Sequence, residues 1–303
     1  MAAAGGLPTH NLDIRENRRM SLAEYAAQNN LTRVGARPPL RDYLVEVWNR
    51  RQFIITLARF RIESENQRNR LGMAWVVIKP LLNAGIYGLI FGILLKGSRP
   101  DKFLEFLIIG VFLFEFFASS FISGATSITK NAALVQSLSF PRMALPVSLV
   151  VQRLLQFIPM VGIMLLIVIA FGTTPSLNWL LLAPLFVLFF VFNAGLALIT
   201  ARLTVHFRDL SQLLPFFTRL MFYTTGLFFS IDVRFKEHPT VLRIADFQPI
   251  HEFLSLARSL LLTGPQYEVK PEYWIYATIW SLAVFAFGTV FFWAAEERYG
   301  RAD

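Results

Sequence analysis

The feature that most constrains this chain is a series of long apolar runs, each about as long as a helix needs to cross a bilayer. Six can be read, at about 74–95, 103–124, 144–172, 178–201, 213–231 and 273–295. A spanning helix needs about 20 apolar residues. With 55% hydrophobic and 16% charged residues and a mean hydropathy of +0.50, the 303-residue chain carries too little charge for a soluble domain of its size. The sequence predicts an all-α membrane protein with six transmembrane helices, in residues 72–303.

Two segments precede the first run. Residues 1–38 are polar and Gly/Pro-punctuated, which predicts a flexible cytoplasmic arm, and their start lacks the apolar stretch of a signal peptide. Residues 39–71 place apolar side chains at helical spacing from Leu40 to Ile62, interrupted at Arg51 and surrounded by arginines. This pattern predicts an amphipathic helix in the membrane interface. The alternative is a packing helix of a small cytosolic domain.

The distribution of Lys and Arg predicts the orientation. Segments on the side of the N-terminus hold 19 of these residues, counting Lys79 near the start of the first run, and segments on the other side hold 8. Basic residues accumulate on the cytoplasmic side. We therefore expect both termini in the cytoplasm, and the net charge of +9 needs no nucleic acid as a partner.

Several kinds of catalytic machinery are missing from the sequence. There is no cysteine, the four histidines are scattered, and no phosphate-binding GxxxxGK[ST] loop, GxSxG elbow or HExxH helix occurs. These absences argue against a self-contained ATPase, hydrolase or metal site, and they leave open an ATPase on a separate chain.

Four stretches carry a family resemblance. They are LARFRIESENQRNRLGMAWVVIKPLL (57–82), GATSITKNAALVQSLSFPRMALPVS (124–148), TVHFRDLSQLLPFFTRLMFYTTGLFFS (204–230) and FQPIHEFLSLARSLLLTG (247–264). With the ending FFWAAEERYGR they resemble the permease subunit of type-2 ABC exporters, closest to the branch that moves lipid-linked polysaccharides such as O antigen, teichoic acid or galactan (Wzm-like). Two departures concern the interface helix: Glu65-Asn66-Gln67 stands where most members have a basic-aromatic-basic triplet, and the N-terminal arm is longer.

The resemblance implies partners and a location. Two copies of the chain would form a homodimeric channel in a bacterial plasma (inner) membrane. Two copies of a separate nucleotide-binding subunit would carry the ATP and magnesium, with no cofactor in this chain. The substrate would be a glycan on a polyprenyl diphosphate carrier, and the general likeness is greatest to actinobacterial galactan exporters.

The resemblance also implies contacts with the ATPase. Residues 128–142 hold a short segment of mixed polarity, closed by a proline that ends a helix. In the family this segment is the coupling helix, so Asn131, Gln136, Pro141 and Arg142 are candidate contacts. The alternative is an ordinary turn. A second candidate contact comprises His206, Phe207, Arg208 and Asp209, which are equally well read as interfacial anchors.

Other candidates concern the substrate and the gate. In the interface helix, Trp48, Arg59 and Arg61 are candidates for binding lipid diphosphate, because guanidinium groups match phosphate geometry. The 232–272 loop contains a short apolar piece, 253–262, too short to span. It resembles the re-entrant gate helices of the family, with Pro249, His251 and Arg258 as gate residues; the alternative is an extracytoplasmic cap.

Polar and aromatic residues within the runs are candidates for lining a channel. Charges inside a span need a partner or a water-filled path, and Glu115 and Arg219 lie deepest. Either they line a conduit or they pair with each other. Aromatic rings on which sugars could stack crowd the second and fifth runs, notably Phe112, Phe116, Phe117, Phe222 and Tyr223. Most phenylalanines in spans simply face lipid.

Two other functions fit parts of the sequence. One is export of a drug or small lipid by the same fold. The other is a membrane-embedded glycosyltransferase acting on polyprenyl carriers, whose general base would come from the acidic and histidine residues of the 232–272 loop. No paired spacing in that loop supports the second.

Overall fold

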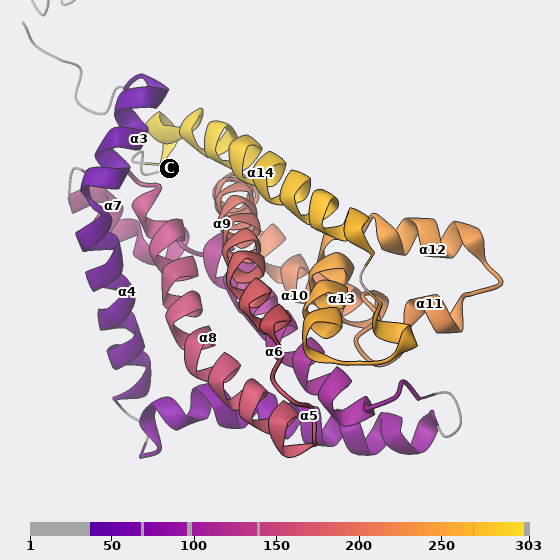
Figure 1. The fold of residues 1–303 in the computed structure, drawn as a ribbon. Coiled ribbons are helices and arrows are strands. Elements are labelled where there is room, and N and C mark those ends of the chain that lie inside the picture. The colour runs from indigo at the N-terminus through magenta and orange to yellow at the C-terminus, as the bar shows by residue number, and fades with distance from the viewer. Residues whose placement is uncertain (1–36, 68–69, 96–98, 138–139, 269, 300–303) are drawn as a thin grey trace, which may run out of the picture. The chain divides into compact units, whose positions relative to one another are not determined.

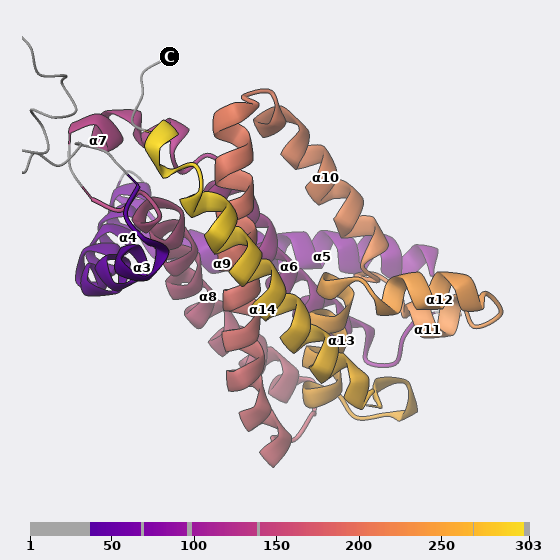
Figure 2. The same ribbon diagram turned by 90° about the horizontal axis from the view of Figure 1, so that it is seen from above.

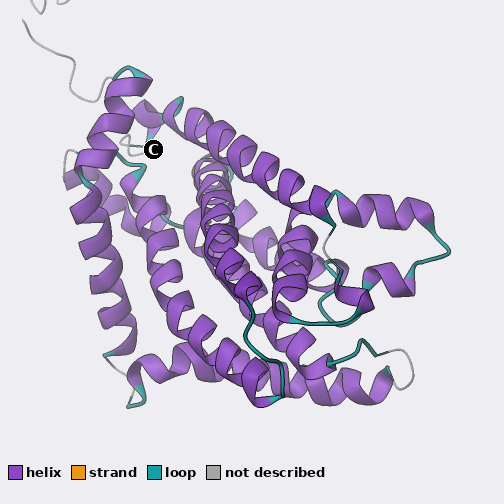
Figure 3. Ribbon diagram, viewed as in Figure 1, coloured by secondary structure: helices purple, strands orange, loops and turns teal. Residues whose placement is uncertain are grey.

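The computed structural model describes residues 37–67, 70–95, 99–137, 140–268 and 270–299, and these ranges contain helices and loops but no strand (Figure 3). Five stretches are long and apolar enough to cross a membrane: Gly72–Leu94, Phe103–Ala125, Ala144–Ala170, Leu177–His206 and Pro265–Trp293. They contain α5 (Trp75–Leu94), α6 (Phe103–Ala125), α8 (Ala144–Ala170), α9 (Leu182–His206) and α14 (Pro271–Trp293). The prediction of an all-α protein with several spans is confirmed.

The fifth apolar run does not form a helix of spanning length. Helix α10 (Leu210–Thr224) has 15 residues, about 22 Å at 1.5 Å per residue, which is shorter than the roughly 30 Å hydrocarbon layer. It ends at a turn in which Gly226 has a φ of 71°, a left-handed conformation that interrupts a helix. Within the described residues the count of spanning helices is therefore five, and the predicted sixth is not confirmed.

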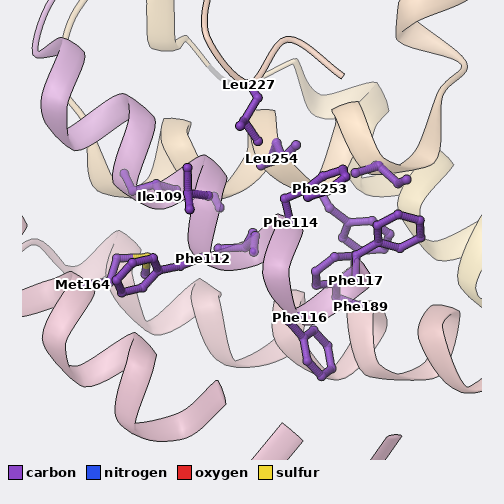
Figure 4. Packing of buried hydrophobic residues seen from close by; sticks show 14 of the residues in the cluster. Ile109, Phe112, Phe114, Phe116, Phe117, Met164, Phe189, Leu227, Phe253 and Leu254 are labelled. Atoms are coloured by element: carbon purple, nitrogen blue, oxygen red, sulfur yellow. The ribbon is translucent and has the colours of Figure 1, made fainter. Parts of the chain in front are cut away.

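Helix α6 is the centre of the packing. It contacts α5, α8, α9, α10 and α13 (Pro249–Leu261), and its side chains are buried along most of its length. Phe112 and Phe117 lie in this core together with Met164 of α8, Phe189 of α9 and Phe253 of α13 (Figure 4). Burial of aromatic side chains stabilises such a core through area and through ring-edge contacts.

Helices α9 and α14 cross closely because both carry glycine at the crossing. A Cβ at Gly195 would lie 2.5 Å from the backbone of Phe285, and a Cβ at Gly288 would collide with the carbonyl of Gly195. Small residues at helix crossings are a common packing device in membranes, where close backbone approach replaces hydrophobic driving force.

One end of the helix bundle, here called the α4 end, carries α3 (Leu40–Asn49), α4 (Arg51–Asn66), α7 (Ala132–Ser137) and the C-terminal turn η5 (Glu296–Arg298). The break between α3 and α4 falls at Arg50, one residue before the predicted interruption. Helix α4 packs on α8 and runs crosswise to α5, as Figures 1 and 2 show. It thus packs on the membrane-spanning helices and not on a separate small domain.

The opposite end, here called the α12 end, carries α11 (Ile231–Arg234), α12 (Pro239–Asp246) and the turn η4 (Pro265–Tyr267). The loop before α6 joins it, since Lys102 Nζ donates to Thr173 Oγ1 and Thr263 Oγ1, both at 3.1 Å. The predicted 253–262 piece belongs to α13, which packs against α6, α9 and α14. The remaining elements are the short 3-10 turns η1 (Gly72–Ala74), η2 (Thr129–Asn131) and η3 (Leu177–Leu181).

Candidate functional site

An open face of the molecule carries polar side chains in the middle of apolar helices. A cavity of about 270 Å³ opens there between α5, α6 and α10, and Asn83, Glu115, Arg219 and Tyr223 line it. All four side chains are exposed. A charged side chain facing lipid at this depth costs several kcal/mol, so this face requires a protein partner or water. We call it the polar face.

Glu115 also connects the polar face to a second cavity. This cavity measures about 400 Å³ and is lined on one side by Lys79 and Trp75 of α5. On its other side Arg153 of α8 is held by Glu65 (3.3 Å), Gln156 (2.8 Å) and Ser123 (3.1 Å). Glu115 therefore lies between the two cavities and lines both of them.

The structure places Glu115 and Arg219 on the same cavity. Within the described residues no ion pair joins them. Each carboxyl or guanidinium group is therefore left to interact with water, a ligand or a second chain.

The aromatic candidates divide into two groups. Phe222 and Tyr223 line the polar face, and the Phe222 ring lies 5.2 Å from Tyr87 and 5.1 Å from Phe114. Phe112 and Phe117 are buried in the core, with at most 1% of their surface exposed, so the structure places them away from this face. Phe116 is 2% exposed and touches the second cavity while stacking on Phe157.

At the α4 end, Arg61 of α4 holds the candidate coupling segment through two hydrogen bonds, here called the Arg61 strap. Arg61 donates to Ser148 Oγ at 2.9 Å and to Asn131 Oδ1 at 3.2 Å, so one guanidinium joins both sides of the segment. Asn131 in turn donates to the carbonyl of Ser127 at 2.7 Å. Helix α7, between them, leaves Gln136 exposed. The segment is therefore fixed at its base and open at its tip.

A second contact, here called the Tyr43 clamp, fixes the end of the coupling segment. The backbone N–H of Arg142 donates to Glu296 Oε1 at 3.0 Å, and its guanidinium donates to the Glu296 carbonyl at 2.8 Å. Tyr43 donates to Glu296 Oε2 at 2.7 Å and accepts from the N–H of Met143 at 3.1 Å. Pro141 is buried beside it. Three distant parts of the chain thus meet at one carboxylate.

Burial controls the ionisation of the clamp. It raises the pKa of Glu296 above its ordinary value, against the opposing effect of the bonds from Arg142 and Tyr43. It also raises the pKa of Tyr43 well above the usual value, assisted by the neighbouring carboxylate. The phenol therefore stays a proton donor at every physiological pH.

The second candidate contact lies beside the C-terminal turn. His206 Nδ1 is 3.0 Å from the carbonyl of Arg202, and its Nε2 is 3.3 Å from Arg298 Nη1. Arg208 and Asp209 are exposed before α10. The structure thus places these residues on the surface of the α4 end.

The interface-helix candidates differ in how far other residues of the chain already bind their side chains. Trp48 is 69% exposed, and Arg59 is exposed without an ion pair among the described residues. The guanidinium of Arg61, by contrast, is already hydrogen-bonded to Ser148 and Asn131. Of the two arginines proposed for phosphate, only Arg59 has its guanidinium available.

Near the α12 end, Arg258 of α13 is buried and fully bonded to backbone. It donates to the carbonyls of Phe106 (3.2 Å), Gly226 (2.9 Å) and Leu227 (3.1 Å), and its guanidinium lies 3.4 Å from the centre of the Phe106 ring. Gly110 makes the room, since a Cβ there would lie 2.5 Å from Arg258 Nη2. The turn after α10 therefore has its carbonyls satisfied by a side chain of α13.

The other α13 candidates support the same junction. Pro249 is the first residue of α13, and His251 Nδ1 is 3.1 Å from the carbonyl of Thr225. Glu252 is 0% exposed, its carboxyl oxygens have no hydrogen-bond partner in the described part of the chain, and burial raises its pKa to about 8.

The sequence reasoning missed the residues that hold the site together. The Tyr43–Glu296 hydrogen bond joins positions 253 residues apart in the chain. The Glu65–Arg153 ion pair also joins distant positions. The only signal was a polar ending, AEERYGR, directly after an apolar run.

Comparisons with known proteins give a family match and several relatives. The model of the family described as ABC-2 type transporter matches residues 51–262. Two relatives from Klebsiella pneumoniae, each named O-antigen export system permease protein RfbA, are 28% identical over 212 residues (70% of this chain, 80% of the relative) and 30% identical over 194 (64% and 73%). A protein of the same name from Myxococcus xanthus is 24% identical over 254 residues, 84% of this chain and 94% of its own length.

Proposed function

Because the chain belongs to the ABC-2 type transporter family, we propose that two copies of it form the channel of an ATP-driven exporter of a lipid-linked polysaccharide. The relatives are permeases of O-antigen export systems by name. A polyprenyl diphosphate glycan, galactan or O-antigen-like, is the proposed substrate.

The observation that carries this proposal is the polar face. Glu115 and Arg219 are exposed in the middle of α6 and α10, next to Asn83 and Tyr223. Lipid cannot cover such a face without a large cost. A second copy facing it would enclose a water-filled path in which charged and aromatic groups meet the hydroxyl groups and C–H faces of sugars.

The α4 end supports a division of labour with a separate ATPase. Its exposed α7 tip and the exposed 206–209 segment offer a surface, and the Arg61 strap and Tyr43 clamp tie that surface to α4, α8 and the C-terminal turn. Closure of two ATPase subunits, each with its own ATP and magnesium, would push here and move the spans.

The orientation follows from this assignment. The α4 end faces the cytoplasm, so both termini are cytoplasmic, and α10 with its following turn provides a sixth crossing of the plasma membrane. Helices α12 and α13 then form the outer gate, and α4 lies in the cytoplasmic interface. The exposed Arg59 attracts the carrier diphosphate there, with Trp48 in the headgroup layer.

The test is reconstitution with the cognate ATPase subunit. The complex is purified in nanodiscs, and ATP hydrolysis is measured with polyprenyl diphosphate glycans of defined structure and with small hydrophobic drugs. We expect stimulation by at least one glycan and its loss in Arg219→Gln, with Arg243→Gln, an exposed arginine of α12 away from the cavity, as the matched control. Stimulation by drugs alone would assign the chain to small-molecule export.

A separate measurement addresses the glycosyltransferase alternative. The purified chain without the ATPase is incubated with a lipid-linked sugar, and the products are separated by mass spectrometry. Turnover under these conditions would contradict the proposed function.

A further inference from the structure

A cavity at the α12 end is lined by hydrogen-bond donors that have no acceptor. It measures about 310 Å³ and lies between the loop before α6, the turn after α10, α11 and η4; Arg99, Arg234 and Gln266 contribute the donors. We call it the Arg99–Arg234 cavity. Among the described residues, no carboxylate side chain lines it.

The three donors are unoccupied in the part of the chain that the structure describes. Neither Arg99 nor Arg234 forms an ion pair there, and the amide nitrogen of Gln266 is buried without a hydrogen-bond partner. A buried donor left unpaired is destabilising. The neighbouring Asp232 does not neutralise the cavity, because it is paired with Lys270 at 2.6 Å.

Two guanidinium groups and an amide without a carboxylate form a site for an oxyanion. Arginine binds phosphate oxygens through parallel N–H groups, with bonds about twice as strong as neutral ones. Carboxylates accept fewer such bonds, and an uncharged sugar leaves two cations unneutralised. The chemistry favours a phosphate or diphosphate.

Apolar groups on the same cavity indicate that the ligand is an amphiphile. Phe229 and Val233 line it, and the Val233 side chain is 60% exposed. Leu94, the last residue of α5, is 71% exposed five positions before Arg99. The cavity thus lies where apolar helices end, the depth at which lipid phosphates sit.

We propose that the Arg99–Arg234 cavity binds the phosphate group of a lipid at the α12 end. Two sources share this chemistry: the diphosphate of an exported carrier lipid, and the phosphate of an anionic phospholipid. The first source rests on the proposed function, under which the α12 end is the outer end and the cavity receives the carrier after transfer. The second does not.

The experiment uses a local reporter. The sequence has no cysteine, so Val233→Cys in the full chain carries a single fluorophore at the cavity, and Leu177→Cys, 85% exposed on η3, carries the control fluorophore. The protein is placed in phosphatidylcholine nanodiscs and titrated with farnesyl diphosphate and, separately, with inorganic diphosphate. The same titrations are repeated in nanodiscs containing phosphatidylglycerol.

The expected result is a saturable signal from the label at 233, and none from the label at 177. Arg99→Gln and Arg234→Gln each weaken binding, and together weaken it at least tenfold, whereas Arg243→Gln, which like each single variant removes one charge at the same end, leaves it unchanged. Both arginines are exposed and without ion pairs, so the variants are expected to fold; a monodisperse profile and an unchanged Tm verify this. Tighter binding of farnesyl than of inorganic diphosphate supports a lipid, and competition by phosphatidylglycerol identifies the phospholipid source.

Two results would overturn the proposal: no signal with any probe, or equal affinity in the double variant and Arg243→Gln. Equal affinity for farnesyl and inorganic diphosphate would reject the lipid and leave a free oxyanion site. The outcome is separable from that of the proposed function. A complex that exports glycan without this binding refutes the cavity alone, and binding in a complex that no glycan stimulates refutes the exporter alone.

Discussion

The Tyr43 clamp makes a quantitative prediction about how the coupling segment is held. Tyr43→Phe removes one hydroxyl and with it two hydrogen bonds, the donation to Glu296 Oε2 at 2.7 Å and the acceptance from Met143 N–H at 3.1 Å. The site is closed to water, since Tyr43 is 1% and Glu296 5% exposed. Solvent cannot replace the lost bonds.

The size of the destabilisation follows from the buried groups that lose their hydrogen-bond partner. A buried group deprived of its partner costs about 1–3 kcal/mol, and bonds to a charged acceptor lie at the upper end of that range. With one carboxylate oxygen and one amide affected, we expect about 2–4 kcal/mol of destabilisation. The matched control is Tyr276→Phe, whose side chain is 39% exposed and whose loss is expected to cost less than about 0.5 kcal/mol.

The assay is thermal unfolding of the purified chain in nanodiscs, followed by ATP hydrolysis of the complex with its ATPase subunit. Tyr43→Phe lowers Tm by several degrees and reduces substrate-stimulated hydrolysis, while basal hydrolysis by the ATPase subunit is retained. A double-mutant cycle with Glu296→Gln measures the pair directly and should give a coupling energy of about 1.5–3 kcal/mol. Additive effects within about 0.5 kcal/mol, or equal Tm values for Tyr43→Phe and Tyr276→Phe, would refute the reasoning.

Three further predictions concern two buried positions and one residue of the polar face. Gly110→Ala forces Arg258 away from its carbonyls and should destabilise the chain by about 1–3 kcal/mol, seen as a lower Tm; an unchanged Tm would contradict the packing. Glu252 has a pKa raised from its ordinary 4.5 to about 8, so its contribution makes stability fall as pH rises across that window, and the Tm of Glu252→Gln should exceed that of wild type at pH 9 but not at pH 4. Glu115→Leu should leave Tm unchanged or higher while lowering glycan-stimulated ATP hydrolysis at least fivefold; undiminished stimulation would remove Glu115 from the channel.

Much of the fold could be predicted because apolar length is a local property. The run predicted at 103–124 is α6, Phe103–Ala125, and that at 144–172 is α8, Ala144–Ala170. The fifth run, whose span is not confirmed, forms a shorter helix than its apolar length suggests. Its composition stays apolar through the turn at Gly226, but the backbone unwinds there because Arg258, 32 residues later, satisfies the freed carbonyl. A hydropathy pattern does not contain such a distant donor.

The site was predictable only in part. Charge at membrane depth made Glu115 and Arg219 candidates, because the cost of placing them in lipid is large whatever the tertiary structure, and both line one cavity. Aromatic content did not separate Phe222, on the polar face, from Phe112, in the core, since both lie in equally apolar runs. Which side of a helix faces a neighbour depends on contacts between helices. The spacing of apolar residues in a single sequence does not show these contacts.

The bonding of Arg258 has a consequence for the route of a polymer. Its three hydrogen bonds to carbonyls on α6 and on the turn after α10 hold these segments against α13 as one block. Separating them would leave a buried cation and three carbonyls without hydrogen-bond partners. Under the proposed function, a polymer would therefore leave beside this block and not through it. Opening the α12 end would then move α13, the turn after α10 and the adjoining part of α6 together.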